Sequence, residues 1–119
     1  MNKNLIPGVS LGTASSQTRY GDRDDVVVIS LQTGSVVSCK FTSNKFKAAP
    51  VKQSIKNLKS INKGEKFFLV NAGNANAGNG KKGEQDVIDY CSHFSKMSSC
   101  DYANVLPFST GVIGENLDV

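Results

Sequence analysis

Apolar residues along the 119-residue chain are grouped in short runs that predict strands. "DDVVVISL" and "SVVSCKF" are β-branched and separated by the turn-prone "QTG", which predicts a hairpin of Val26 to Leu31 with Val36 to Phe41. "KFFLVN" is an apolar run of strand length, and Val105 to Phe108 form another near the end of the sequence. The expected order is strand, hairpin, helix, strand, loop, helix, strand.

The stretch "PVKQSIKNLK" has the spacing of an amphipathic helix. Val51, Ile55 and Leu58 occupy positions i, i+4 and i+7, behind a proline, Pro50, that suits the first helical turn. Lysines 52, 56 and 59 fall on the opposite side of the expected helix. We therefore expect the apolar stripe to face the rest of the protein.

A second helix is predicted for "EQDVIDYCSHFSKM", where Val87, Cys91 and Phe94 recur with helical spacing. Glu84 and Asp86 stand where the start of a helix favours negative charge. Together these elements predict a single α/β domain over residues 1–119, with a mixed sheet that carries at least two helices on one side.

Composition restricts the location of the protein. Its 39% of hydrophobic residues suffice for one core, and no run approaches the length of a membrane span. Cys39, Cys91 and Cys100 form no metal-ligand spacing, and no presequence is evident, which favours reduced thiols and no structural zinc. We expect a soluble cytoplasmic protein that does not bind membranes.

The net charge of +4 is concentrated in a lysine-rich stretch, residues 40–66. Nucleic-acid surfaces usually interleave arginine and aromatic side chains with lysine, because forked donors and stacking faces make contacts that a point charge cannot. Every basic residue of this stretch is lysine. A solvated face is therefore favoured over a nucleic-acid site.

A glycine-rich loop at residues 73–83 raises the alternative of a nucleotide-binding module. Gly78, Gly80 and Gly83 spell GxGxxG, but six residues separate the preceding strand from the first of these glycines, whereas a dinucleotide fold needs almost none. A Walker loop fails because Asn79 stands where lysine is required. The many asparagines of the loop suit either a structural role or the lining of a cleft.

The polar turn Ser109, Thr110, Gly111 follows the last apolar run. A threonine hydroxyl beside a glycine amide offers two donors that can converge on one oxygen, as in an oxyanion hole. The alternative is a helix cap that leads toward Glu115, and the local sequence by itself favours the cap. His93, the sole histidine, has no triad partners nearby, so we expect a surface or core-edge residue.

Several longer motifs occur together in one known family. "GVSLGTA", "RDDVVVISL", "FTSNKFKAAPV", "LVNAGNANAGNG" and "VLPFSTGVIGE" appear in this order, and the chain resembles the glutamate N-acetyltransferases, also called ornithine acetyltransferases, from about Ile6 to Glu115. Where the family usually has "NSGNANACTG", this chain has Ala72, Gly78 and Asn79 in place of Ser, Cys and Thr.

The resemblance implies acetyl transfer from N-acetylornithine to glutamate in arginine biosynthesis, through an acetylated threonine. Many members also accept acetyl-CoA as a substrate, and no metal or redox cofactor is implied. In this family Thr110 and Gly111 would form the oxyanion hole, which raises that interpretation above the helix cap.

The resemblance also implies a larger assembly. Family members cleave themselves just before the nucleophilic threonine into an α chain and a β chain, which form an αββα four-layer sandwich and an α2β2 heterotetramer. The sequence ends at Val119, before the positions of the cleavage site and the nucleophile. We therefore expect an N-terminal part of the α chain that is inactive without the β chain.

Overall fold

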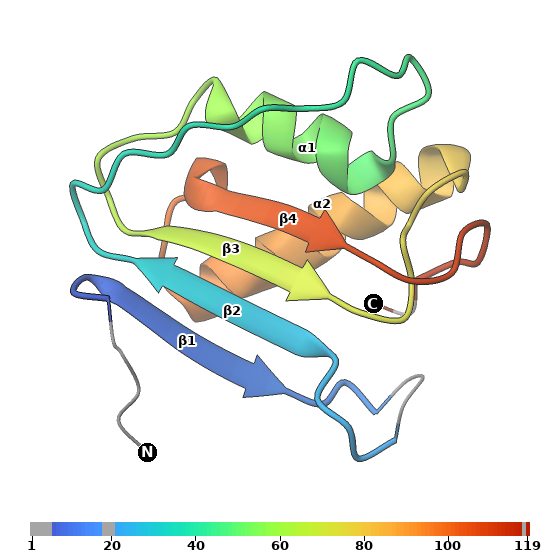
Figure 1. Ribbon diagram of the computed structural model, residues 1–119, viewed down its shortest axis with the longest axis horizontal. Helices are drawn as coiled ribbons and strands as arrows, with labels where there is room; N and C mark the ends of the chain where they lie inside the picture. Colours follow the sequence, from blue (N-terminus) through green and yellow to red (C-terminus); the bar gives the residue numbers. More distant parts are fainter. Residues whose placement is uncertain (1–5, 18–20, 118) are drawn as a thin grey trace.

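The computed structural model describes residues 6–17, 21–117 and 119, which form one sheet and two α-helices (Figure 1). In chain order the elements are β1 (Val9–Ala14), β2 (Val26–Leu31), α1 (Ala49–Leu58), β3 (Lys66–Asn71), α2 (Gly80–Met97), the 3-10 helix η1 (Tyr102–Asn104) and β4 (Val105–Ser109).

The sheet has the strand order β1-β2-β3-β4 and is mixed. β2 pairs antiparallel with both β1 and β3, and β4 pairs parallel with β3. Leu69 marks the register at the centre, since it lies opposite Val28 of β2 and Pro107 of β4. The predicted α/β class with a mixed sheet is confirmed.

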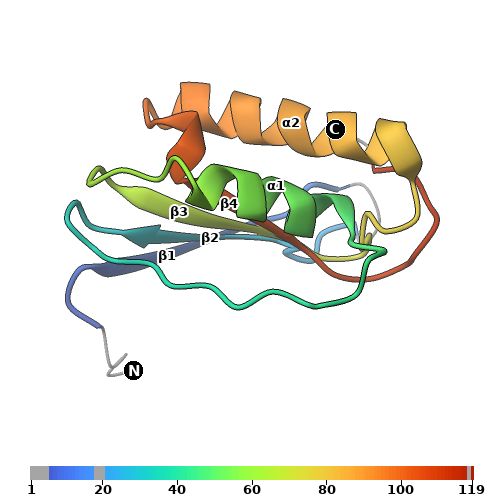
Figure 2. The ribbon, with the colours of Figure 1, turned by 90° about the horizontal axis from the view of Figure 1, so that it is seen from above.

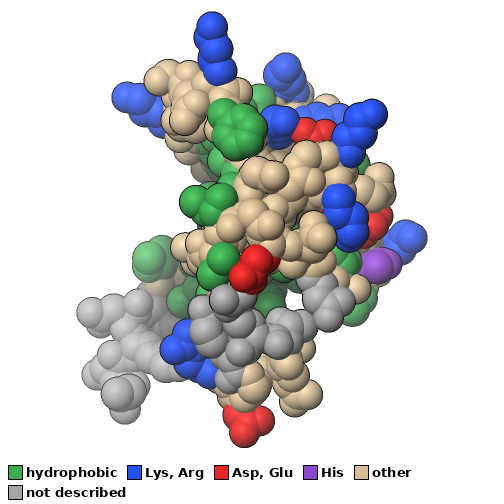
Figure 3. All heavy atoms as spheres, turned by 90° about the vertical axis from the view of Figure 1, so that its right-hand side faces the viewer, with side chains coloured by type: hydrophobic (Ala, Val, Ile, Leu, Met, Phe, Trp, Pro, Cys, Tyr) green, Lys and Arg blue, Asp and Glu red, His purple; other side chains and the backbone are tan. Residues whose placement is uncertain are grey.

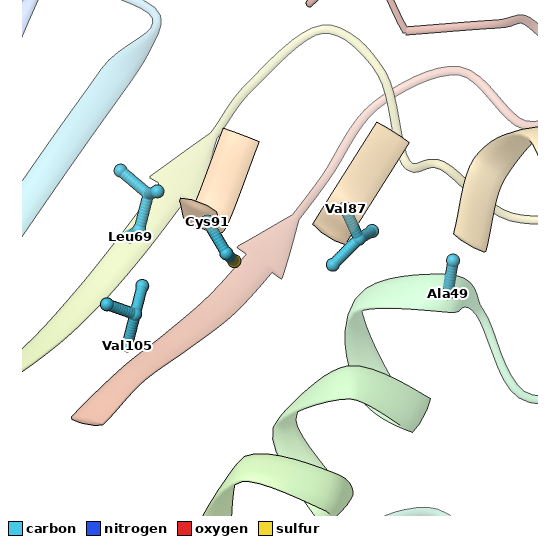
Figure 4. Close-up of a cluster of buried hydrophobic side chains, with 5 residues drawn as sticks. All are labelled: Ala49, Leu69, Val87, Cys91 and Val105. Atoms are coloured by element: carbon cyan, nitrogen blue, oxygen red, sulfur yellow. The ribbon is translucent and has the colours of Figure 1, made fainter. Parts of the chain in front are cut away.

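α2 covers one face of the sheet, and α1 lies on the same side along β4 (Figure 2). The buried core between them joins both helices to the central strands through Ala49, Leu69, Val87, Cys91 and Val105 (Figure 4). Val87 and Cys91 are fully buried, as their helical spacing predicts. Within the described ranges, no helix has the length and apolarity that a membrane span needs.

The predicted hairpin partner Val36 to Phe41 is wrong, because residues 36–41 contain no strand. β2 itself forms as predicted, but its two edges are occupied by β1 and β3, so no edge remains for residues 36–41. After Leu31 the chain turns away at Gly34, whose amide donates to the Lys63 carbonyl at 2.7 Å. The β-branched residues of this stretch belong to an irregular connection.

α1 begins one residue before Pro50, but its expected buried face is wrong. Val51, Ile55 and Leu58 are only half-buried, whereas Gln53, Ser54 and Asn57 are buried. The reason lies in β4, an edge strand whose outer carbonyls need partners. The Ser54 hydroxyl donates to the Pro107 carbonyl at 2.9 Å, and the Asn57 amide donates to the Val105 carbonyl at 2.7 Å.

α2 begins at Gly80, four residues before the predicted start. Glu84 and Asp86 therefore lie outside the first turn, where no acidic residue stands. Glu84 forms an ion pair with Lys52 of α1 at 2.6 Å, while Asp86 is buried and pairs with Lys82 of its own helix. Both carboxylates thus form ion pairs with lysines of the helices. The prediction that they stabilise the start of α2 is wrong.

The sheet face opposite the helices carries a second set of apolar side chains. Alternation along the paired strands places Leu11, Ile29 and Phe68 on one face, and Phe68 stacks edge-on against Phe108 with ring centres 5.5 Å apart. Leu11 remains 71% exposed and Phe108 43% exposed. The four-layer sandwich stays a prediction, and this is the face on which a second sheet would pack.

Candidate functional site

The candidate site lies where β3 and β4 end together. Because these strands are parallel, Asn71 at the end of β3 pairs with Ser109 at the end of β4. The chain then continues through Thr110 and Gly111, while the loop 72–79 leads from β3 toward α2. Figure 3 faces this end of the molecule, where hydrophobic side chains reach the surface along the left edge of the view.

The backbone of the loop and the backbone after β4 are hydrogen-bonded to each other. The Thr110 amide donates to the Asn71 carbonyl at 3.0 Å, and the Val112 amide donates to the Gly73 carbonyl at 3.2 Å. The Gly111 amide lies between these two bonded amides and has no hydrogen-bond partner among residues 6–17, 21–117 and 119. The amide is thus available to a ligand.

The backbone at Gly111 permits only glycine. Its φ is +129°, and a Cβ at this position would lie 2.3 Å from the carbonyl carbon of Gly73 and 2.6 Å from the amide nitrogen of Asn74. Real side chains do not reach such distances, so the two backbones touch because Gly111 has no Cβ. The loop after β3 therefore fixes the path of the chain at Gly111.

The Thr110 side chain is exposed. Its hydroxyl has no hydrogen-bond partner in the part of the chain that the structure describes. No helix follows in residues 110–117, so the helix-cap interpretation of Ser109 and Thr110 is wrong. The structure therefore leaves the hydroxyl and the neighbouring Gly111 amide as two unused donors on adjacent residues.

Asparagines of the loop hold its backbone from within. The buried Asn74 donates from Nδ2 to the carbonyls of Glu115 and Asn116, at 3.1 and 2.9 Å, and accepts from the Asn76 amide at 2.7 Å. Asn76, 1% exposed, donates to the Gly83 carbonyl at 2.9 Å. The structural role that the sequence predicted for the asparagines of this loop is confirmed, since their side chains bind its backbone.

Below the turn, hydrogen bonds of Asn71 connect the ends of β3 and β4, and Tyr90 of α2 contributes a further buried polar group. The Ser109 hydroxyl donates to Oδ1 of Asn71 at 2.5 Å, and Nδ2 of Asn71 donates to the Asn74 carbonyl at 2.9 Å. The buried Tyr90 hydroxyl has no hydrogen-bond partner among the described residues. Burial raises the pKa of Tyr90 above its usual range, and the nearby Ser109 offsets this only in part.

A cavity of about 610 Å³ lies between α2 and the sheet. Its walls are mostly apolar, with Val26, Val28 and Leu69 of the sheet facing Phe94 of α2, and Asn71 stands at its polar end. His93, which is exposed as predicted, also contributes to the lining. Thr110 and Gly111 are not among the residues that line this cavity.

The GxGxxG glycines of the nucleotide alternative border only a small hollow. The hollow beside Gly78 and Gly80 measures about 50 Å³ and includes the acidic Glu84, whereas ligand pockets usually reach about 300 Å³ or more. Gly83 is buried against Asn76 and belongs to α2, so its amide cannot cradle a phosphate. The loop serves packing in place of phosphate binding.

The lysine-rich stretch is solvated along α1, where Lys52 and Lys56 are exposed, as is Lys59 just after the helix. Lys66 is an exception at 3% exposed, and its ammonium donates to the Gly64 carbonyl at 2.9 Å. The expectation of a fully solvated face is therefore wrong at this position, because Lys66 begins the central strand β3.

Comparison with known proteins gives one consistent match. The model of the ArgJ family matches residues 10–119. The "Arginine biosynthesis bifunctional protein ArgJ" of Colwellia psychrerythraea is 40% identical over 94% of this chain, and that of Psychrobacter arcticus is 39% identical over 95%. The chain spans only 28% and 27% of these two relatives.

Two solved structures are similar in fold. The crystal structure of the arginine biosynthesis bifunctional protein ArgJ from Bacillus halodurans matches 93% of this chain and 57% of its own, with a TM-score of 0.83 and 28% identity. The ornithine acetyltransferase of Mycobacterium tuberculosis, solved with ornithine, matches 93% and 60%, with a TM-score of 0.77 and 24% identity. The latter identity supports the fold alone.

Proposed function

The chain belongs to the ArgJ family, and we propose that it forms part of an acetyltransferase of arginine biosynthesis that moves an acetyl group from N-acetylornithine to glutamate. Thr110 and Gly111 supply the oxyanion hole of this reaction. A threonine nucleophile is contributed by the β chain, and the 119 residues are inactive without it. Acetyl-CoA is a further candidate donor, and the complete enzyme is an α2β2 heterotetramer.

The proposed chemistry needs two donors at one oxygen. Attack of the threonine hydroxyl on the acetyl carbonyl forms a C–O bond and moves the carbonyl electron pair onto oxygen. Collapse of this intermediate breaks the C–N bond, and ornithine leaves with a proton on its amine. Attack by the glutamate amine on the acetyl-threonine repeats the sequence, so the same pair of donors serves both steps.

One observation carries the proposal. Within the residues that the structure describes, the Gly111 amide has no partner between two bonded amides, and it lies next to an exposed threonine hydroxyl in a backbone conformation that favours glycine. Donors that are fixed before the reaction need no reorganisation, and the loss of one typically costs about 3 to 4 kcal/mol of transition-state stabilisation.

Substitution of the Thr110 hydroxyl tests this function. The substitutions are made in a full-length enzyme that contains residues 1–119, either the complete gene product or a chimera with the Colwellia relative. Thr110→Val keeps the shape but removes the donor, and we expect kcat to fall about 100- to 1,000-fold with little change in KM. Thr110→Ser keeps the donor and should retain most of kcat.

The matched control is Thr33→Val, because Thr33 is an exposed threonine in the turn after β2. This variant should keep the kcat of the unmodified enzyme. A Thr110→Val enzyme whose kcat equals that of Thr33→Val would refute the role of Thr110, and absence of acetyl transfer from N-acetylornithine to glutamate in the unmodified enzyme would refute the function itself.

A further inference from the structure

Asn74 has an unusual set of contacts beside the candidate oxyanion hole. It is 8% exposed, and its side chain makes the three hydrogen bonds described above, with Asn76, Glu115 and Asn116. Its backbone forms isolated bridges with Thr110 on one side and Val112 on the other. One residue therefore contacts the chain before, at and after Gly111.

We propose that Asn74 is the positioning residue that holds the Thr110–Gly111 turn in its donor geometry, an inference that rests on the proposed function. Asn74 touches neither donor with its side chain, so it acts through the backbone. Its side-chain amide anchors the carbonyls at positions 115 and 116, and the neighbouring Gly73 and Ala75 bond to Val112 at 3.2 and 2.9 Å. The turn is thereby fixed at both of its ends.

The chemistry of the side chain explains why an amide is needed. Oδ1 must accept the Asn76 amide, while Nδ2 must donate to two carbonyls. An aspartate of the same shape keeps the acceptor but places a second oxygen about where Nδ2 stands, facing two carbonyl oxygens. Like partial charges repel at that distance, so Asn74→Asp should push residues 115–116 away and release the turn.

The chain offers a closely matched control in Asn57. This residue is 3% exposed, donates from Nδ2 to the carbonyls of Tyr102 and Val105 at 3.2 and 2.7 Å, and accepts from Gln53 at 2.7 Å. Asn57→Asp thus makes the same chemical change in the same kind of buried site. Asn57 lies in α1 and binds the start of β4, whereas Asn74 acts beyond the end of β4.

The first test compares kinetics in the full-length enzyme described above. We expect Asn74→Asp to lower kcat at least tenfold with KM changed less than twofold, because the oxyanion exists only in the transition state. Asn57→Asp should lower the melting temperature by a similar amount while it leaves kcat near that of the unmodified enzyme. Equal kcat values for the two aspartate variants would overturn the inference.

A double-mutant cycle asks whether Asn74 acts through Thr110. If it does, the Asn74→Asp/Thr110→Val enzyme should lose less activity than the product of the two single losses, since one variant already removes what the other positions. Multiplicative losses would contradict the inference. If Thr110→Val alone leaves kcat unchanged, the proposed role of Thr110 in the oxyanion hole fails, and the positioning role of Asn74 is then decided by hydrogen exchange alone.

Hydrogen exchange of the backbone gives a readout independent of activity. Asn74→Asp should speed exchange in peptides covering residues 109–114, where the Thr110 and Val112 amides are bonded to the loop, and Asn57→Asp should leave this region unchanged. Unaltered exchange there in Asn74→Asp would overturn the inference. Should that variant fail to fold, Asn74→Ala removes the same donors without adding a charge, and the same two outcomes apply.

Discussion

Replacement of Gly111 by alanine tests the packing of the turn against the β3–α2 loop. The new methyl group would lie 2.3 Å from the backbone of Gly73, and the residue would keep a φ of +129°. A positive φ costs an L-residue about 1 to 2 kcal/mol. Forcing two packed backbones apart adds about 1 to 3 kcal/mol, so the expected loss in unfolding free energy is about 2 to 5 kcal/mol.

Gly114→Ala is the matched control, because Gly114 also has a positive φ, +84°, but no atom of the described residues lies within 4 Å of the place that its new methyl group would take. Gly114→Ala should lose only the unfolding free energy that the positive φ costs, about 1 to 2 kcal/mol. With a urea dependence of about 1 to 3 kcal/mol per molar, the two variants should unfold about 1 M apart, Gly111→Ala first. Both are measured by circular dichroism at one protein concentration.

The contact itself would be refuted by coincident urea midpoints for Gly111→Ala and Gly114→Ala. That result would mean that the loop after β3 gives way without cost, and that Gly73 does not fix the path of the chain at Gly111. A destabilisation of Gly114→Ala as large as that of Gly111→Ala would have the same meaning.

Three further predictions concern the edge, the acid stability and the open face of the sheet. Ser54→Ala should lower the unfolding free energy by about 1 to 3 kcal/mol, because the buried Pro107 carbonyl loses its donor. Ser60→Ala, at an exposed position, should have little effect, and equal urea midpoints for the two variants would contradict this prediction. Hydrogen bonds from the Ser16 hydroxyl and amide hold the pKa of Asp25 below its usual 3.8, so its contribution to stability is present above about pH 4 and is lost as the pH falls through the lowered pKa. Asp25→Asn should therefore lose less stability than the unmodified chain between pH 6 and pH 2 in urea titrations, and equal losses would exclude this role. The 119-residue chain should elute earlier from a size-exclusion column as its concentration rises, because Leu11 and Phe108 are exposed on the open sheet face. The double variant Leu11→Ser/Phe108→Ser should show a smaller shift in elution. A compact monomer at all concentrations would count against this prediction.

Local sequence patterns predicted the elements whose structure depends on residues close to one another in the sequence. They also predicted elements that are apolar along most of their length. Helical spacing identified the α2 residues Val87 and Cys91, which are fully buried, and the apolar run of β3 became the strand at the centre of the sheet. Pro50 marked the start of α1 to within one residue. The adjacent Thr110 and Gly111 were also identified from the sequence, since their chemistry depends on residue type and on the resemblance to a family.

The amino-acid sequence alone thus determined the class of fold, both α-helices and the strands β2, β3 and β4, whereas the donor pair Thr110 and Gly111 stays a prediction. Only the tertiary structure decided that β2 pairs with β1 and β3, that α1 buries Ser54 and Asn57 in place of its apolar stripe, and that Asn74 supports the turn. The physical reason is distance along the chain. Asn57 and Val105 are 48 positions apart, and a hydrogen bond between such residues leaves no trace in local periodicity.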